Sequence, residues 1–596
     1  MKLWKKVLSV ATAGVLCLGS VGVTGMQSVL ESVGTVLSVS AEGTDETERV
    51  PVSTGTTTVR VGTGTTQLEY QAFDDDTVEI TDCDNEAAGE LEIPAEIDGK
   101  PVTSIGDGAF SVCSGLTKIT IPNGVTSIGD YAFSDCSGLT EITIPNGVTS
   151  IRDGAFSNCS GLTEITIPDS VTSIGDNAFS DCSGLTEITI PDSVTSIRAG
   201  AFYNCSGLTE ITIPDSVTSI GDEAFHNCSG LTEITIPDSV TSIGNRTFSL
   251  CSSLTEITIP DSITSIGYRA FSDCDSLTEI TIPDSVTSIG SSAFSFCDSL
   301  TEITIPDSVT SIGSYAFEET PWLTAKQAKD PLVIVNHILI DGKTCTGAVS
   351  IPNGVTSIGD SAFVCCSSLT EITIPDSVTS IGDGAFSSCS SLTEITIPDS
   401  VTSIGYSAFF CCASLTNITI PDSVTSIGDS AFYCCDSLTN ITIPDSVTSI
   451  GDYAFYDCTN LTIYGYTGSY AETYAKENDI PFVSLGNITT TETTTTTIET
   501  TVTTTTETMV TTKTTTTTTK QDSETPTVIY GDITLDGRVD ITDAVLLNKF
   551  CSGAVILNDA AKLNSDCDGD GDITGNDAVA LLQFLVQIVQ KLPYTA

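Results

Sequence analysis

Hydrophobic positions along most of the chain recur with a period of 23 residues. One period, starting at Leu162, reads LTEITIPDSVTSIGDNAFSDCSG. The stretch LTEITI alternates as a β-strand does, and VTSI predicts a second short strand. Proline and aspartate follow the first strand and glycine follows the second, which are residues typical of turns. No segment of the repeat has the 3.6-residue period of a long helix, so the pattern predicts a β-rich coil.

A proline and a phenylalanine mark each repeat. The prolines recur from Pro122 to Pro306, and the phenylalanines recur from Phe110 to Phe317. The series resumes at Phe363, two periods after Phe317, which places a divergent coil at residues 318–350. A single unit cannot bury its apolar side, whereas stacked units can, with strands about 4.8 Å apart.

We therefore expect a solenoid of 23-residue coils with parallel strands over residues 90–463. Residues 42–89 are expected to lead into it or cap it. At the other end, residues 464–486 leave the pattern and predict a cap. Within that cap, helix-forming residues follow Ser469, which is a suitable N-cap.

The repeat spacing L-x-x-I-x-I, with a cysteine three residues before the leucine, resembles the leucine-rich repeat. The phrase IPDSVTSIGDxAFxxCSSLTEITIP is similar to the BspA-like bacterial surface proteins, and the likeness covers residues 91–485. Members of that family are implicated in adhesion and in binding proteins or polysaccharides. The resemblance thus implies a leucine-rich-repeat solenoid with a binding surface, and it names no ligand.

Stacking of the repeats predicts a column of acidic side chains. Lys118 begins the column, and Asn417 and Asn440 end it. Its carboxylates are either a solvated face that keeps the rod soluble or a docking face for a basic or cation-bridged partner. The threonines beside it, such as Thr143 and Thr166, offer hydrogen bonds to sugars or protein, but few exposed aromatic side chains are expected there. The glutamates are Glu141, Glu164, Glu187, Glu210, Glu233, Glu256, Glu279, Glu302, Glu371 and Glu394.

Cysteines form a second column, at a position that is buried in leucine-rich repeats. We expect these thiols to be reduced and to pack as small hydrophobic groups. An exported protein offers oxidising conditions, and among the additional cysteines Cys411 and Cys434 are the best disulfide candidates, because they fall on adjacent coils. The column comprises Cys113, Cys136, Cys159, Cys182, Cys205, Cys228, Cys251, Cys274, Cys297, Cys366, Cys389, Cys412, Cys435 and Cys458.

Charge and the N-terminus indicate an exported protein. The 596 residues include 77 acidic and 21 basic ones, a net charge of -56, which disfavours nucleic acid and anionic lipid as partners. Lys2, Lys5 and Lys6 precede an apolar stretch, and small residues before Glu42 suit cleavage. Residues 1–41 are therefore expected to be a signal peptide, with an uncleaved anchor as the alternative. We expect no membrane span in the mature chain.

A threonine-rich tract at residues 487–528 is too polar to bury a core and is expected to be a linker. Two loops after it have the spacing of calcium ligands, with a glycine at the sixth position. Hard oxygen donors in this number favour two Ca²⁺ ions. The first loop offers Asp532, Thr534, Asp536, Arg538 through its carbonyl, Asp540 and Asp543. The second loop offers Asp566, Asp568, Asp570, Asp572 through its carbonyl, Thr574 and Asp577.

Each loop ends in aspartate and precedes an apolar helix, so residues 529–596 resemble a type I dockerin. The threonines at Thr534 and Thr574 depart from the usual Asn or Asp. The resemblance implies docking to a cohesin module of a scaffoldin in a cellulosome-type complex. The residues that it assigns to the cohesin contact are Ile541, Thr542, Asn548 and Lys549 in the first half and Gly575, Asn576, Leu582 and Gln583 in the second. The halves differ, so one binding orientation is expected to dominate.

The sequence contains no recognisable catalytic motif. His226 occupies a variable repeat position, His337 lies in the divergent coil, and neither has the sequence context of a nucleophile. We therefore interpret the chain as a secreted, non-catalytic binding protein that contributes to polysaccharide catabolism within its complex. Two alternatives stay open: a cell-surface adhesin or structural spacer, and an unrecognised enzyme acting on polysaccharides.

Overall fold

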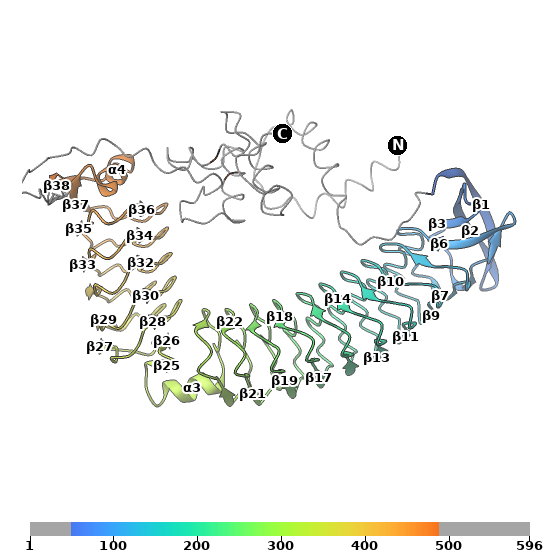
Figure 1. Ribbon diagram of the computed structural model, residues 1–596, viewed down its shortest axis with the longest axis horizontal. Coiled ribbons are helices and arrows are strands. Elements are labelled where there is room, and N and C mark those ends of the chain that lie inside the picture. The colour runs from blue at the N-terminus through green and yellow to red at the C-terminus, as the bar shows by residue number, and fades with distance from the viewer. Residues whose placement is uncertain (1–48, 488–546, 548–564, 566–596) are drawn as a thin grey trace, which may run out of the picture. The chain divides into compact units, whose positions relative to one another are not determined.

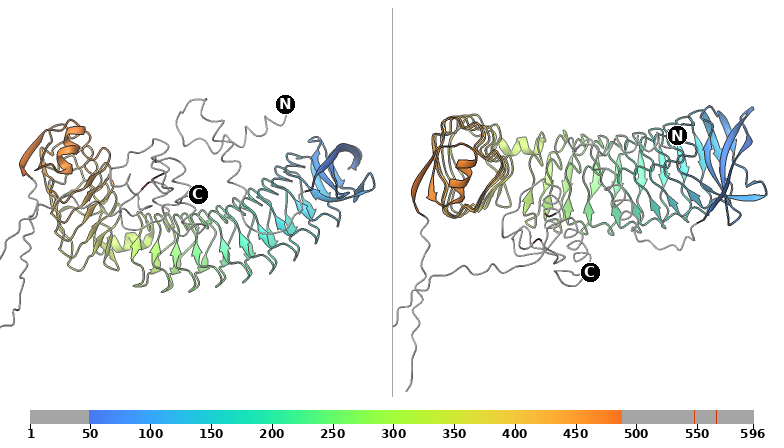
Figure 2. Two further views of the ribbon diagram at one scale, coloured as in Figure 1. Left: turned by 45° about the horizontal axis from the view of Figure 1, so that its top comes forward. Right: turned by 90° about the horizontal axis from the view of Figure 1, so that it is seen from above.

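The computed structural model describes residues 49–487, together with Leu547 and Ser565. The chain divides into two compact units, Met1–Ile488 and Thr489–Ala596, and the solenoid occupies the first. Its coils each contribute two short strands, and strands of the same kind lie side by side along the stack (Figures 1 and 2). The β solenoid with 23-residue coils is thus confirmed.

The first row of strands comes from the Glu-Ile-Thr part of each repeat. Before the divergent coil it consists of β7 (Leu116–Thr120), β9 (Glu141–Thr143), β11 (Glu164–Thr166), β13 (Glu187–Thr189), β15 (Glu210–Thr212), β17 (Glu233–Thr235), β19 (Glu256–Thr258), β21 (Glu279–Thr281) and β23 (Glu302–Thr304). After that coil it consists of β27 (Gly347–Ser350), β29 (Leu369–Thr373), β31 (Glu394–Thr396), β33 (Asn417–Thr419) and β35 (Asn440–Thr442).

The second row comes from the Ser-Ile part of each repeat. It consists of β8 (Ser127–Ile128), β10 (Ser150–Ile151), β12 (Ser173–Ile174), β14 (Ser196–Ile197), β16 (Ser219–Ile220), β18 (Ser242–Ile243), β20 (Ser265–Ile266), β22 (Ser288–Ile289), β24 (Ser311–Ile312), β28 (Ser357–Ile358), β30 (Ser380–Ile381), β32 (Ser403–Ile404), β34 (Ser426–Ile427) and β36 (Ser449–Ile450). In both rows the pairing is parallel and in register, as Ser173 opposite Ser196 shows. Identical residues therefore stack on one another.

The core is built from columns of identical side chains. Phe133 stacks on Phe156 with ring centroids 5.4 Å apart and an interplanar angle of 7°. The same stacking runs from Phe110 to Phe317 and again from Phe363 to Phe455. Each fully buried phenylalanine contributes about 1.5–3 kcal/mol of hydrophobic stabilisation. Coils are thus held together by contacts with their immediate neighbours, as in other solenoids.

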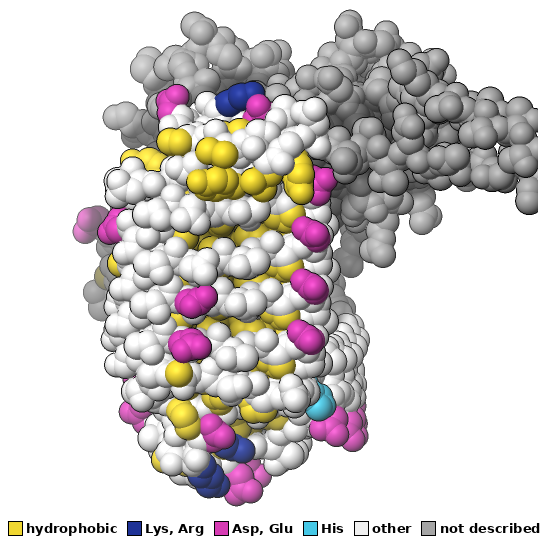
Figure 3. All heavy atoms as spheres, turned by 90° about the vertical axis from the view of Figure 1, so that its left-hand side faces the viewer, with side chains coloured by type: hydrophobic (Ala, Val, Ile, Leu, Met, Phe, Trp, Pro, Cys, Tyr) yellow, Lys and Arg dark blue, Asp and Glu magenta, His cyan; other side chains and the backbone are white. Residues whose placement is uncertain are grey.

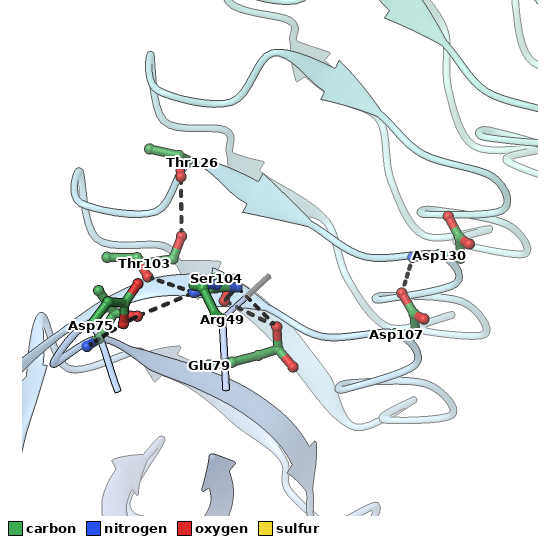
Figure 4. Close-up of polar contacts among 9 residues, drawn as sticks. Arg49, Asp75, Glu79, Thr103, Ser104, Asp107, Thr126 and Asp130 are labelled. Carbon is green, nitrogen blue, oxygen red and sulfur yellow. Dashed lines mark hydrogen bonds and ion pairs between the residues drawn. The ribbon is translucent and has the colours of Figure 1, made fainter. Parts of the chain in front are cut away.

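An N-terminal hairpin covers the first coil. Antiparallel strands β1 (Pro51–Val61) and β2 (Gly64–Phe73) lead to β3 (Val78–Cys83), β4 (Gly89–Glu92), β5 (Glu96–Ile97) and β6 (Lys100–Ile105). Strand β4 pairs with β7 of the first row, and β6 pairs with β8 of the second. Arg49 fixes this end, because its guanidinium lies 3.7 Å from Glu79 and donates to Ser104 over 3.3 Å (Figure 4).

The divergent coil contains a helix that the sequence pattern does not reveal. Helix α3 (Pro321–Gln327) begins behind Thr320, whose hydroxyl accepts a hydrogen bond from the Leu323 N–H over 3.1 Å. Trp322 meets Phe317 with centroids 4.8 Å apart and so ends the first phenylalanine column. Strands β25 (Val333–Val335) and β26 (Ile338–Asp341) follow, and β26 pairs with β28 to restart the second row.

The C-terminal end repeats this arrangement. Strand β37 (Thr462–Thr467) pairs with β35, helix α4 (Tyr470–Glu477) follows, and β38 (Phe482–Asn487) pairs with β37. Ser469 caps α4 by accepting from the N–H of Glu472, so the helix predicted behind Ser469 is confirmed. Tyr474 of α4 meets Phe455 edge to face at 6.0 Å and ends the second column.

Candidate functional site

The glutamate column lies on the surface of the first row of strands. Parallel pairing sets Glu187 opposite Glu210, and both are exposed, whereas the isoleucine after each is buried. Lys118 begins the column with an ion pair to Glu141, 2.5 Å away. Strands β15, β17 and β19 line a hollow of about 230 Å³. Figure 3 shows the coils from the side of β27 to β35, with acidic side chains separated by uncharged ones. The predicted column is confirmed.

The recurring serines and threonines of the repeat connect neighbouring coils. Ser193 donates its hydroxyl hydrogen to the carbonyl of Val171 over 2.6 Å, and Thr195 donates to the carbonyl of Thr172 over 3.2 Å. Equivalent bonds recur along the stack. Because these side chains satisfy backbone carbonyls of the coil before them, their recurrence has a structural cause.

The cysteine column is also structural. Its thiols are buried, and Cys205 donates to the carbonyl of Phe179 over 3.1 Å. Burial raises the pKa of the Cys205 thiol well above its ordinary value, which disfavours the reactive thiolate. The predicted burial is therefore confirmed. Cys411 and Cys434 are free thiols in this structure, and partial burial with the neighbouring Cys411 raises the pKa of Cys434 to about 11.

A different part of the coil varies from repeat to repeat. We call it the variable turn: the eight residues that follow each Ser-Ile strand and end at the column cysteine, for example residues 198–205. Its Ala, Phe and Cys positions are buried, whereas its second, third, sixth and seventh positions change between coils. Within the regular coils that the structure describes, all exposed large hydrophobic side chains lie in this turn. They are Val112, Tyr131, Leu250, Tyr268, Phe296, Tyr315, Tyr406, Tyr453 and Tyr456.

The backbone of the variable turn is left-handed at its third and seventh positions. Asn, Asp or Gly occupies many of these positions and suits that conformation. Val112, Leu250 and Phe296 adopt it with φ values of 67°, 62° and 59°. A bulky side chain in this conformation is unfavourable by about 1 kcal/mol or more. These three side chains are exposed and apolar, and their backbone conformation is unfavourable. Their presence is therefore not explained by folding stability, which favours a role in recognition.

The same turn also contains arginines, although Asp and Glu outnumber them there. The four arginines of the regular coils, Arg152, Arg198, Arg246 and Arg269, all lie in it. The guanidiniums of Arg246 and Arg269 lie 5.5 and 5.2 Å from the ring centroid of Tyr268, and Arg246 also pairs with Glu223 over 2.9 Å. The variable turn therefore offers guanidinium groups and aromatic rings, which the acidic strand face lacks.

Sequence reasoning placed the binding surface on the glutamate and threonine face and missed the variable turn. The signal was present in the sequence, because a nearly perfect repeat shows directly which positions are free to differ. Constant positions are needed for stacking, and varying exposed ones are available for recognition. The expectation of few exposed aromatic side chains was made for the strand face and holds there, whereas the exposed aromatic side chains of the regular coils lie in the variable turn.

The two histidines have packing roles. The ring of His226 stacks on Tyr203 with centroids 4.8 Å apart, and burial lowers the pKa of His226. The Nδ1 atom of His337 lies 2.9 Å from the carbonyl oxygen of Gly354. Among the described residues, no group of three or more His, Cys, Asp or Glu side chains is arranged to hold a metal ion.

Several predicted segments lie outside the described residues. They are the signal peptide at residues 1–41, the linker at 487–528 beyond its first residue, and all the calcium ligands and cohesin contacts named for the dockerin. In the part of the chain that is described, no helix has the length and apolar character needed to cross a bilayer.

The repeats match a known family over more than half of the chain. Six copies of the BspA type Leucine rich repeat region cover residues 103–232, 218–336 and 342–462. The chain belongs to the BspA-type leucine-rich-repeat family. Residues 530–586 match the Dockerin type I domain, so this BspA-type protein also carries a type I dockerin. Both are non-catalytic module types, and both are typical of extracellular proteins.

Solved structures of other leucine-rich-repeat proteins are similar to this one. A leucine-rich repeat protein from Bacteroides ovatus is 32% identical, and the match covers 66% of this chain and 98% of that one, with a TM-score of 0.43. A leucine rich cell surface protein from Faecalibacterium prausnitzii is also 32% identical, over 70% of this chain and 97% of that one, with a TM-score of 0.33. Comparison with curated proteins gives no match.

Proposed function

We propose that this protein is a secreted, non-catalytic binding component of a cellulosome-type complex. Its dockerin attaches it to a cohesin of a scaffoldin in a calcium-dependent way, and its solenoid presents a surface to a protein or polysaccharide ligand. One observation carries the proposal: a dockerin shares the chain with a solenoid whose exposed variation is concentrated in the variable turn. Cohesin binding follows from the type of module, and ligand binding follows from the surface.

The calcium loops support the first half of the proposal through their chemistry. Each loop offers five side-chain oxygens and one backbone carbonyl at the spacing of a calcium-binding loop, which fits Ca²⁺. The ligands would be the residues named for residues 532–543 and 566–577. Bound calcium would supply the positive charge that holds these acidic loops closed, and so would fix the two helices that bear the cohesin contacts.

Capture on immobilised cohesin tests this half. We expect the full-length protein to bind with calcium and to be released by EDTA. The variant with Asp543→Ala and Asp577→Ala, which lacks the last ligand of each loop, should bind at least about ten-fold more weakly. Retained capture of that variant, or capture that survives EDTA, would contradict calcium-dependent docking.

The unequal halves of the dockerin allow a sharper test. We expect the variant with Ile541→Ala and Thr542→Ala to lose far more affinity than the variant with Gly575→Ala and Asn576→Ala. The sequence supports a single dominant orientation, because the paired positions differ in size and polarity. Equal losses from the two variants would instead favour two equivalent orientations.

The nature of the solenoid ligand separates this proposal from a cell-surface adhesin or spacer. Arrays of plant polysaccharides and of host glycoproteins, probed with the full-length protein, are expected to show polysaccharide binding. Binding confined to host glycoproteins would favour the adhesin. Product formation from a bound polysaccharide would show instead that the chain is an enzyme.

A further inference from the structure

A groove lies at the C-terminal end of the solenoid, between the last variable turn and the cap. It has a volume of about 400 Å³. Tyr453, Tyr456 and Asp457 line it on the side of the turn, and Asn478 and Asp479 line it on the side of the cap. Small-ligand pockets span about 300–1,000 Å³. The groove is thus large enough for a short stretch of saccharide.

Aromatic rings converge on this groove. Phe410, Tyr433 and Tyr456 stack in successive coils, with centroids 4.9 and 5.2 Å apart. Tyr456 is the last ring of the row, so no further coil stacks a ring on its outer face. Tyr453 meets Tyr456 at 5.7 Å and an angle of 79°. Tyr453 is 63% exposed and Tyr456 is 54% exposed, so both offer apolar ring surface to a ligand.

Backbone donors face the same end of the stack. In earlier coils, three N–H groups of the variable turn donate to carbonyls of the next coil. The bonds before the last coil run from Ser430 to Asp452, from Phe432 to Ala454 and from Cys434 to Tyr456, over 2.8, 2.8 and 2.9 Å. The equivalent donors of the last coil belong to Tyr453, Phe455 and Asp457, and no regular coil follows them.

The cap satisfies only part of this set. The hydroxyl of Tyr474 in α4 lies against the backbone amide of Phe455. Within the described residues, the N–H groups of Tyr453 and Asp457 have no hydrogen-bond partner. These two donors flank the groove, where backbone polar groups need a partner from water or from a ligand.

The remaining groups of the groove are mainly acceptors. Asp457 and Asp479 contribute carboxylates, and the amide nitrogen of Asn478 is already engaged with the Tyr474 carbonyl over 2.9 Å. None of the lining residues is basic. Sugar hydroxyls both donate and accept hydrogen bonds, so they match carboxylate acceptors beside backbone donors. An acidic polymer would be repelled by the two carboxylates, and the exposed tyrosine rings suit the flat apolar face of a sugar ring.

We propose that this groove binds a neutral polysaccharide, with a sugar ring on the free face of Tyr456 and hydroxyl groups bonded to Asp457 and to the two flanking amides. The inference rests on the ligand-binding role proposed above and assigns that role a place and a ligand class. Tyr453 closes one side of the site, and the cap residues Asn478 and Asp479 close the other.

The repeat supplies variants that retain the fold. Serine occupies the position of Tyr453 in another coil, at Ser430, and the position of Tyr456 at Ser387. The test variant therefore carries Tyr453→Ser and Tyr456→Ser. Tyr131→Ser is a matched control, because Tyr131 occupies the repeat position of Tyr453, with φ of 56° against 57°, and is likewise exposed.

Binding is measured by affinity electrophoresis and calorimetry on the full-length protein. The probes are xyloglucan, mixed-linkage β-glucan, glucomannan and arabinoxylan, with polygalacturonate as the acidic polymer. We expect binding to at least one neutral polymer, weaker binding to polygalacturonate, and a loss of about ten-fold or more in the double variant. The Tyr131→Ser control should bind as the parent does, and circular dichroism should show all three proteins equally folded.

Two results would overturn the groove assignment. They are no binding of the parent to any neutral polymer, and equal binding by the parent and the double variant. Equal binding by the double variant would mean that the solenoid binds the polysaccharide at another site, so the proposed ligand-binding function would stand without the groove. Cohesin capture is judged by its own assay and does not depend on these tyrosines.

Discussion

The thiol of Cys182 donates a hydrogen bond to the carbonyl oxygen of Phe156, 3.1 Å away in the preceding coil. The same bond recurs along the stack, for example from Cys159 to Phe133 and from Cys412 to Phe386. A cysteine here fills a small buried space and satisfies a buried carbonyl at once. These two roles explain why cysteine recurs at this position although the cysteines of the described residues are free thiols.

Removing one of these thiols should destabilise the solenoid. Cys182→Ala is expected to lower the free energy of unfolding by about 1–2 kcal/mol, because it leaves the Phe156 carbonyl unsatisfied and a small cavity. Urea unfolding followed by circular dichroism measures the change. The exposed Cys365, replaced by serine, is the control and should change stability by less than about 0.5 kcal/mol. Equal effects of the two substitutions would contradict a structural role for the column.

Stability should decline at alkaline pH. Burial raises the pKa of Cys136 from 9.0 to about 12, so its thiol stays protonated in the fold and ionises in the unfolded chain above pH 9. The stabilisation is fully present below pH 9 and is lost as the pH rises from 9 towards 12, by about 1.4 kcal/mol per pH unit for each such thiol. Urea unfolding at pH 8 and pH 10.5 measures it, and Cys136→Ala should make the decline shallower.

The helix of the divergent coil should be essential to the first phenylalanine column. Trp322 is 6% exposed and covers Phe317, the last ring of that column. We expect Trp322→Ala to lower the free energy of unfolding by about 3–5 kcal/mol through the cavity it leaves. Hydrogen exchange should rise first in β23 and β24. The exposed Leu250, replaced by serine, is the control, and equal exchange in both variants would argue against a capping role for α3.

The glutamate column should cost stability at low salt. Glu233 lies between Glu210 and Glu256 in register, so each carboxylate repels its neighbours. Replacing Glu233 with asparagine, the residue found at Asn417 and Asn440, should raise the free energy of unfolding by about 0.2–1 kcal/mol. Asparagine can replace this repulsion with a hydrogen bond, as at Asn417, whose side-chain amide donates to Glu394 over 3.1 Å. The gain should shrink at 1 M salt, and a gain independent of salt would point to another cause.

The sequence predicted the repeating architecture because the repeat encodes it locally. Alternation in Glu-Ile-Thr, a turn at Pro-Asp and the 23-residue spacing of phenylalanine and cysteine are visible without any tertiary information, and each appears in the structure as predicted. Helix α3 was missed, since its seven residues carry too short a pattern to distinguish from a loop, and its role depends on Phe317 lying beneath Trp322.

The surface available for recognition was decided by the tertiary structure. The sequence shows tyrosines at positions 453 and 456, but only the fold shows that their rings meet edge to face. The fold also shows that backbone donors beside them have no following coil. Stacking converts each local preference into a column, so the coil and its core follow from the amino-acid pattern alone. Which side chains face an open end depends on where the stack stops, and that is a property of the whole solenoid.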